Sequence, residues 1–187
     1  MSVSVSVSGE VIILTGPPGA GKTTVAGLIA GEASAPTVQL TTDLFYRSIR
    51  TGFVLPFLPA AHRQNEVVIE AIVGTVATFA RGGYDVVVDG IVGPWFLPPF
   101  RAMAERDHFA LSYVVLRPGL DTALSRARQR AGEELRDVDA ITGLYGAFAR
   151  LKELEGNVVD TSDLDAEQTA AEVRRVIASG NCRLQPG

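Results

Sequence analysis

The chain has little of several residue types, and each scarcity excludes a class of protein. Its 187 residues include one cysteine, so no internal disulfide can form, which fits a reducing compartment. The net charge of −4 at pH 7 gives no basic surface for a nucleic acid duplex. No apolar run approaches the ~20 residues needed to span a bilayer. We therefore expect a cytoplasmic monomer or homodimer with no nucleic-acid or membrane partner.

The two ends of the chain are expected to lie outside one folded domain. Residues 1–9 alternate valine and serine without the basic start or apolar run of a signal peptide. We interpret them as a disordered tail, with an edge strand as the alternative. Residues 10–180 can bury a core and contain no repeat or linker, which predicts a single domain. Residues 181–187 are expected to form a C-terminal tail.

Short apolar runs rich in β-branched residues alternate with segments of helical spacing along the whole chain. Strands are expected at residues 10–15, 37–40, 84–88, 109–116 and 157–159. Helices are expected at residues 23–32, 44–50, 61–81, 120–131, 138–153 and 166–178. This alternation is typical of an α/β fold of three layers, with a five-stranded parallel sheet covered by helices on both faces.

The segment Gly-Pro-Pro-Gly-Ala-Gly-Lys-Thr matches the phosphate-binding P-loop pattern, and it lies between a predicted strand and a predicted helix. Its glycines lack a Cβ, so backbone N–H groups can approach phosphate oxygens closely. Lys22 supplies a positive charge to the β- and γ-phosphates, and the Thr23 hydroxyl can join the shell of a Mg²⁺ ion. The predicted cofactors are therefore ATP and Mg²⁺. The residues expected to hold the nucleotide are Gly16, Pro17, Pro18, Gly19, Ala20, Gly21, Lys22, Thr23 and Thr24.

The rest of the sequence favours phosphoryl transfer over the chemistry of a signalling GTPase. The Asn-Lys-x-Asp stretch that reads guanine is missing, because the only lysine after the P-loop is Lys152. On the predicted helix at residues 120–131, Arg126 and Arg130 fall on one flank, beside a polar lid at about residues 131–137. Such a lid excludes water, and its arginines offset charge on the transferring phosphoryl group. A solvated basic face with acidic neighbours is the alternative.

Five groups of residues follow one another along the chain: Gly16–Thr23, Thr42-Asp43, Val87–Gly90, Arg126 with Arg130, and Val159–Ser162 before the last helix. In this order they resemble the small P-loop kinases that include chloramphenicol phosphotransferase, gluconate and shikimate kinases and the zeta-toxin-like kinases. The resemblance runs from about residue 11 to residue 178. It implies an adenylate-kinase-like core and ATP- and Mg²⁺-dependent transfer of a phosphoryl group to a hydroxyl of a small acceptor.

The resemblance also implies roles for single residues. Asp43 matches the carboxylate that accepts the proton of the acceptor hydroxyl, and an N-cap of the following helix is the alternative. Asp89 ends a run of buried valines, where it could serve Mg²⁺ or meet the acceptor, with a strand-end turn as the alternative. Lys22, Arg126 and Arg130 complete the expected catalytic set, and Arg130 is also expected to contact the nucleotide.

The segment after Asp89-Gly90 departs from the adenylate kinases, in which Phe-Pro-Arg follows closely. Here no charged residue comes before Arg101, which disfavours a nucleoside monophosphate as the acceptor. Aromatic residues at 44–59 and 91–100, with a few polar groups, are typical of a pocket for a natural-product or drug-like alcohol, and a sugar acid is the alternative. The residues expected to bind the acceptor are Arg47, Arg63, Asp89 and Trp95.

Two other functions stay open on the sequence alone. One is an ATPase switch or accessory protein that binds ATP, hydrolyses it slowly and acts through a partner surface. The other is a kinase of a macromolecule, such as an RNA end. The acidic charge balance argues against the second function.

Overall fold

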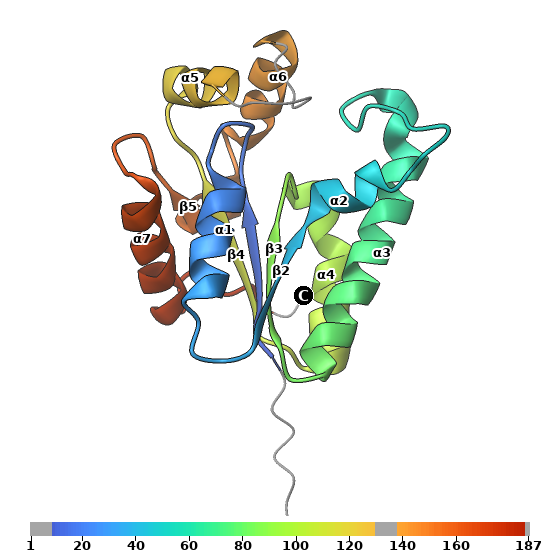
Figure 1. Cartoon of the computed structure of the whole chain (residues 1–187), viewed down its shortest axis with the longest axis vertical. Helices are drawn as coiled ribbons and strands as arrows, with labels where there is room; N and C mark the ends of the chain where they lie inside the picture. The colour runs from blue at the N-terminus through green and yellow to red at the C-terminus, as the bar shows by residue number, and fades with distance from the viewer. Residues whose placement is uncertain (1–8, 130–137, 186–187) are drawn as a thin grey trace, which may run out of the picture.

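The computed structural model describes residues 9–129 and 138–185. Five parallel strands form one sheet in the order β2-β3-β1-β4-β5. Figure 1 shows this sheet in the centre of the molecule with helices on both sides, which confirms the predicted three-layer α/β fold. The strands are β1 (Val11–Thr15), β2 (Thr37–Thr41), β3 (Asp85–Asp89), β4 (Leu111–Leu116) and β5 (Val158–Val159).

Helices α1 and α7 cover one face of the sheet, and α3 and α4 cover the other (Figure 1). In the described ranges, no helix has the length and apolar character that crossing a membrane requires. The α-helices are α1 (Lys22–Gly31), α2 (Thr42–Arg47), α3 (His62–Arg81), α4 (Leu97–Asp107), α5 (Leu120–Gln129), α6 (Val138–Phe148) and α7 (Ala166–Ala178). Short 3-10 segments lie at Pro59–Ala61, Pro94–Phe96 and Lys152–Asn157.

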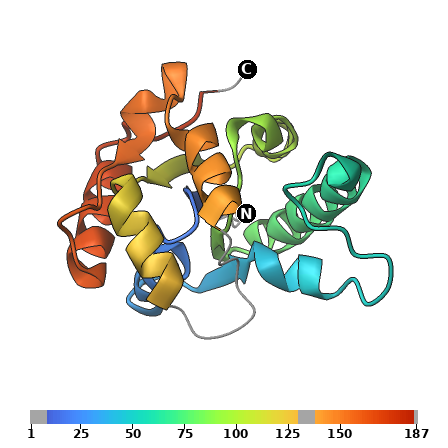
Figure 2. The same cartoon turned by 90° about the horizontal axis from the view of Figure 1, so that it is seen from above.

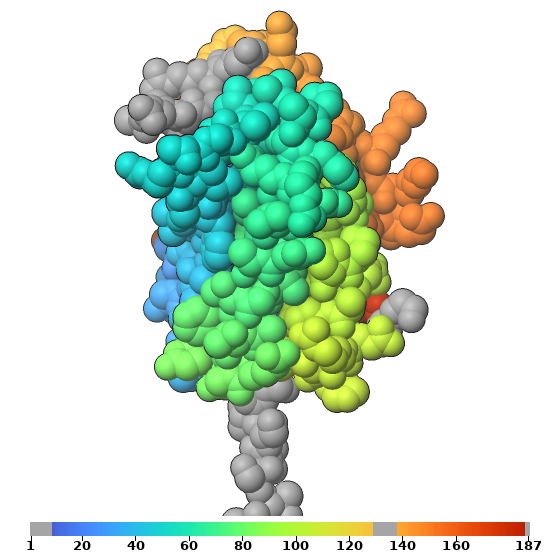
Figure 3. Space-filling view, turned by 90° about the vertical axis from the view of Figure 1, so that its right-hand side faces the viewer, coloured from blue at the N-terminus to red at the C-terminus, as the bar shows by residue number. Residues whose placement is uncertain are grey.

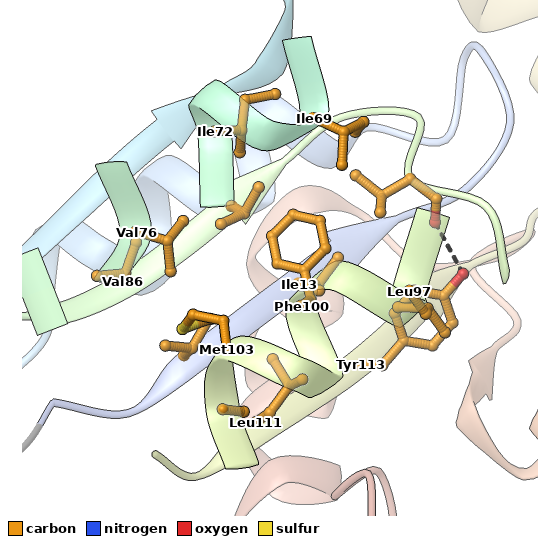
Figure 4. Packing of buried hydrophobic residues seen from close by; sticks show 14 of the residues in the cluster. Ile13, Ile69, Ile72, Val76, Val86, Leu97, Phe100, Met103, Leu111 and Tyr113 are labelled. Carbon is orange, nitrogen blue, oxygen red and sulfur yellow. Dashed lines mark hydrogen bonds between the residues drawn. The ribbon is translucent and has the colours of Figure 1, made fainter. Parts of the chain in front are cut away.

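The central strand β1 is buried on both sides, and its side chains alternate between two cores. Ile13 packs in the core under α3 and α4, whereas Leu14 packs in the core under α1 and α7. Figure 4 shows Ile13 close to Ile72 of α3 and Phe100 of α4. Burial on both faces explains why β1 is a nearly continuous apolar run. It also leaves the carboxyl ends of the strands as the edge at which polar side chains collect.

Helix α4 is absent from the prediction made from the sequence. Its first turn contains Pro98 and Pro99, which disfavour a helix interior. Proline is tolerated in the first turn because its missing N–H would have no intrahelical partner there. The expected helix through residue 153 is also wrong beyond Phe148, since Lys152 has a φ of 52°, which an α-helix does not contain.

The segment expected to be a C-terminal tail packs against the sheet as far as Gln185. Cys182 is buried, and its carbonyl accepts a hydrogen bond from the Tyr113 N–H at 2.9 Å. The Leu184 N–H donates to the Leu111 carbonyl, also at 2.9 Å. These bonds cover the first half of β4, because the two-residue β5 pairs only with the last two residues of that strand.

Most of the predicted N-terminal tail and all of the predicted lid fall outside the described residues. Gly9 is buried, and its N–H donates to the Ala80 carbonyl at 3.1 Å. The remainder of the expected N-terminal tail, residues 1–8, lies outside the described ranges. The expected lid at residues 131–137 lies outside them too, together with Arg130.

Candidate active site

The P-loop joins β1 to α1 at the carboxyl edge of the sheet, and two of its glycines are required by close packing. Gly16 has a φ of 144°, and a Cβ there would lie 2.1 Å from the Leu116 carbonyl oxygen. Gly19 has a φ of 80°, and its Cβ would lie 2.1 Å from the Ala123 carbonyl oxygen. No side chain fits so close to the backbone, so the contacts of the loop with β4 and α5 require glycine at these two positions.

Lys22 begins α1 and is buried, with its side chain folded back over the loop. Its Nζ donates to the Pro17 carbonyl at 2.9 Å. A buried ammonium needs hydrogen-bond acceptors, and the Pro17 carbonyl supplies one. The positive charge is therefore held next to the loop N–H groups, where phosphate oxygens bind in P-loop proteins.

Asp89 lies at the end of β3, is 1% exposed, and collects three hydrogen bonds from the neighbouring elements. Thr23 Oγ1 donates to its Oδ1 at 2.8 Å. Gln39 Nε2 donates to its Oδ2 at 2.8 Å, and Thr41 Oγ1 donates to the same oxygen at 2.9 Å. The three donors come from α1 and β2, and together they fix the orientation of the Asp89 carboxyl group.

Gln39 and Thr41 are functional candidates that the sequence interpretation missed. Both lie on β2, two residues apart, and therefore point to the same face of the sheet. In the register of β2 with β3, Thr41 lies opposite Asp89. The alternation of polar residues in this strand is the sequence signal that could have indicated them. The strand order that brings them to Asp89 is not a local property of the sequence.

Helix α2 follows β2 directly, and Asp43 is its second residue. The Asp43 side chain is exposed. The N-cap alternative for this residue is wrong, because α2 begins at Thr42 and Thr41 occupies the N-cap position. Burial, and secondarily the Asp43 charge, raise the pKa of Tyr46 to about 12. The Asp43 carboxylate is thus exposed at the carboxyl edge of the sheet, the edge that also carries the P-loop.

The loops after β2 and β3 are in close contact at this edge. A Cβ on Gly90 would lie 1.8 Å from Thr42 Oγ1, so only glycine allows the approach. Two residues later, the Val92 N–H donates to Thr15 Oγ1 at 2.9 Å. The Val92 carbonyl accepts from the Tyr113 hydroxyl at 2.9 Å, as Figure 4 shows. The loop after Asp89 is therefore tied to β1 and, beyond it, to β4.

Figure 2 looks onto the carboxyl edge of the sheet, with α5 and α6 on one side and α2 and α3 on the other. On α5, the Arg126 guanidinium donates to the Thr161 and Leu164 carbonyls, at 3.2 and 3.1 Å. These bonds join α5 to the loop before α7. The predicted placement of Arg126 and Arg130 on one flank of this helix stays a prediction, because only Arg126 lies within the described residues.

Of the residues expected to bind the acceptor, Arg63 and Trp95 line grooves beside α3, whereas Asp89 lies at the end of β3 and lines neither groove. A groove of about 390 Å³ lies between α2 and α3, and a larger one of about 700 Å³ lies between the start of α3 and residues 95–99. Arg63 lines both, and Trp95 lines the larger one. Arg47 is exposed in the last turn of α2 and lines neither of these two grooves.

Across residues 9–129 and 138–185, no cluster of three or more His, Cys, Asp or Glu side chains is arranged to hold a metal ion. Thr23 and Asp89 nevertheless fit Mg²⁺. This ion is usually held by one or two protein oxygens together with substrate phosphates and water.

A parallel sheet in this strand order, with a P-loop after β1 and a carboxylate ending the adjacent β3, defines a P-loop nucleotide-binding domain of the kinase-like type. The chain belongs to the AAA_33 family of AAA domains, whose model matches residues 11–148. Membership of this P-loop family implies binding of ATP.

Several solved structures share the fold, and two of the following three are named as kinases. The APS kinase of Mycobacterium tuberculosis superposes with a TM-score of 0.67 at 18% identity, over 91% of this chain and 98% of that one. The gluconokinase of Sinorhizobium meliloti gives 0.61 at 20% identity, over 94% and 92% of the two chains. The tunicamycin resistance protein of Deinococcus radiodurans gives 0.66 at 17% identity, over 95% and 99%.

Curated relatives match over shorter stretches. The Holliday junction branch migration complex subunit RuvB of Thermomicrobium roseum is 37% identical over 78 residues, which is 37% of this chain. The same subunit of Paenarthrobacter aurescens is 35% identical over 106 residues, or 50% of this chain. The matches span 22% and 28% of those proteins, so the chain covers about a quarter of the length of these relatives.

Proposed function

We propose that the protein is an ATP- and Mg²⁺-dependent phosphotransferase that moves the γ-phosphoryl group to a hydroxyl of a small molecule. The observation that carries the proposal is the 2.8 Å hydrogen bond from Thr23 to Asp89, beside Lys22 and at the same edge as Asp43. A triphosphate site and an exposed carboxylate next to it are what transfer to an alcohol needs.

The donor half of the site would hold the nucleotide phosphates. Lys22 would place its charge on the β- and γ-phosphates, with Arg130 as a predicted second cation. Because the Thr23 hydroxyl donates a hydrogen bond to Asp89, the lone pairs of its oxygen are available to a metal ion. Bound Mg²⁺ would neutralise charge on the phosphate oxygens.

The acceptor half would supply the hydroxyl and remove its proton. The acceptor oxygen forms a bond to the γ-phosphorus as the bond to the β–γ bridging oxygen breaks, and ADP leaves. Asp43 would take the hydroxyl proton. Arg47, Arg63 and Trp95 would bind the rest of the acceptor.

Three further observations support this proposal. Two of the compared structures of the same fold are named as a gluconokinase and an APS kinase, which are enzymes with small acceptors. The chain has 17 basic and 21 acidic residues, and this excess of negative charge disfavours a nucleic-acid acceptor. The single cysteine, buried and unpaired, suits action in the reducing cytoplasm.

The experiment is a screen of small alcohols for stimulated release of ADP from ATP and Mg²⁺, followed by mass spectrometry of the product. Lys22→Gln should abolish the stimulated rate, whereas Lys152→Gln, at the only other lysine of the chain, should leave it unchanged. Slow ATP hydrolysis that no acceptor stimulates would contradict the proposal and favour the ATPase switch.

A further inference from the structure

The larger groove beside α3 has a composition that points to a particular ligand chemistry. Its volume of about 700 Å³ lies within the range of small-molecule sites. One wall is a face of α3, and the other is formed by residues 95–99 at the start of α4. Figure 3 views the side of the molecule on which α3 and α4 lie next to each other.

One residue that lines the groove, Asn65, has a buried amide oxygen without a donor among the described residues. Asn65 lines the groove and is 9% exposed. Its Nδ2 donates to the Pro56 carbonyl at 2.8 Å, which fixes the orientation of the amide. Its Oδ1 is buried and has no hydrogen-bond partner among the described residues. A buried amide oxygen left without a donor is unfavourable, so the wall of the groove at Asn65 is polar and incompletely satisfied.

The groove-lining side chains of α3 include two glutamates, one arginine and one histidine. Residues 62, 66 and 70 are spaced by four, so they lie on one side of the helix. Glu66 pairs with Arg63 at 3.2 Å and contacts His62 at 3.3 Å. Glu70 has no ion-pair or hydrogen-bond partner in the described part of the chain. The groove therefore offers one uncompensated carboxylate.

Aromatic surface also lines the groove, on the wall that faces α3. Trp95 is 50% exposed, and its ring packs at 6.2 Å from that of Phe148 in α6. Phe57 and Leu58 add exposed apolar surface at the other end of the groove. An aromatic face and a carboxylate together attract a cation through its charge and its apolar substituents.

The groove is connected to the P-loop through the loop after β3. Trp95 follows Val92 by three residues, and the Val92 N–H is bonded to Thr15, which directly precedes the P-loop. A ligand in the groove thus lies against a segment whose start is fixed to the nucleotide-binding edge.

We propose that this groove binds a small molecule with an amine and an aromatic or other apolar part. The ammonium would lie at Glu70, and the apolar part would lie on Trp95. That this molecule is the phosphoryl acceptor, an amino alcohol, rests on the proposed function.

The test uses three probes that share a phenyl ring and an alcohol and differ in charge: phenylethanolamine, phenylethylene glycol and mandelate. Trp95 is the only tryptophan, so its fluorescence reports binding to the full chain without any turnover. The amine should bind about fivefold tighter than the glycol, and mandelate should bind weakest. Glu70→Gln should remove the preference for the amine.

The control is Glu105→Gln, at another exposed glutamate, on α4 and outside the groove, which should leave all three affinities unchanged. Equal affinity for the three probes, or a preference for the amine that survives Glu70→Gln, would overturn the proposal. Amine binding that stimulates no ADP release would support the groove as an amine site and count against phosphoryl transfer to this molecule.

Discussion

Thr41 Oγ1 donates a hydrogen bond to Asp89 Oδ2 at 2.9 Å, across the boundary between an edge strand and its neighbour. This bond, with the one from Gln39, fixes the carboxylate whose other oxygen accepts from Thr23. Asp89 is therefore held on both sides before any metal ion arrives. An oriented carboxylate loses little freedom when it enters the shell of a bound ion.

Thr41→Val should weaken the response to Mg²⁺, because it removes one of the donors that orient Asp89. Loss of such a supporting bond typically costs 10–100-fold in metal affinity or activity. Thr41→Ser keeps the hydroxyl and should restore most of the response. The measurement is the Mg²⁺ concentration that gives half-maximal ATP turnover. An unchanged Mg²⁺ dependence in Thr41→Val would show that the bond has no such role.

Asp43→Asn should lower kcat for phosphoryl transfer by about 10²–10⁴-fold, the usual contribution of a general base. The affinity for ATP, measured by titration calorimetry, should stay unchanged because the side chain is exposed and belongs to the acceptor half. The stability of the fold should not change either. Turnover at the wild-type rate would remove Asp43 from the mechanism and leave it as a surface residue of α2.

Tyr113→Phe should lower the free energy of unfolding by about 1–3 kcal/mol. The substitution leaves the Val92 carbonyl without its donor in a buried position. Burial raises the pKa of the Tyr113 phenol, so the hydroxyl remains a donor throughout the working range. Urea denaturation measures the loss. Tyr84→Phe, at an exposed tyrosine, is the matched control and should cost almost nothing.

The acid stability of the protein should depend on Asp107. Hydrogen bonds from Arg106 first, and then from Arg81, lower the pKa of this carboxyl to about 2. A lowered folded-state pKa stabilises the fold above the unfolded value of about 3.9, and this contribution is lost as the pH falls toward about 2. Asp107→Asn should flatten the decrease in Tm over this window. An identical acid profile for the variant would contradict the assignment.

The sequence predicted where the P-loop and Asp89 lie in the fold, because both signals are local. The P-loop is one contiguous segment, and Asp89 is recognisable from the buried valines before it. Gln39 and Thr41 were missed because their role depends on which strand lies beside β3. That strand order is set by contacts between residues far apart in the sequence. Helix α4 was missed because its own prolines argue against a helix.

The C-terminal segment has a consequence for how the protein should be handled. Cys182 and Leu184 supply the backbone groups that the first half of β4 lacks, since β5 is too short to reach it. A chain cut after residue 180 would keep every residue of the candidate active site. It would also present an open apolar strand edge, ready to pair with another copy. We expect such a truncated chain to bind ATP when fresh and to aggregate on storage.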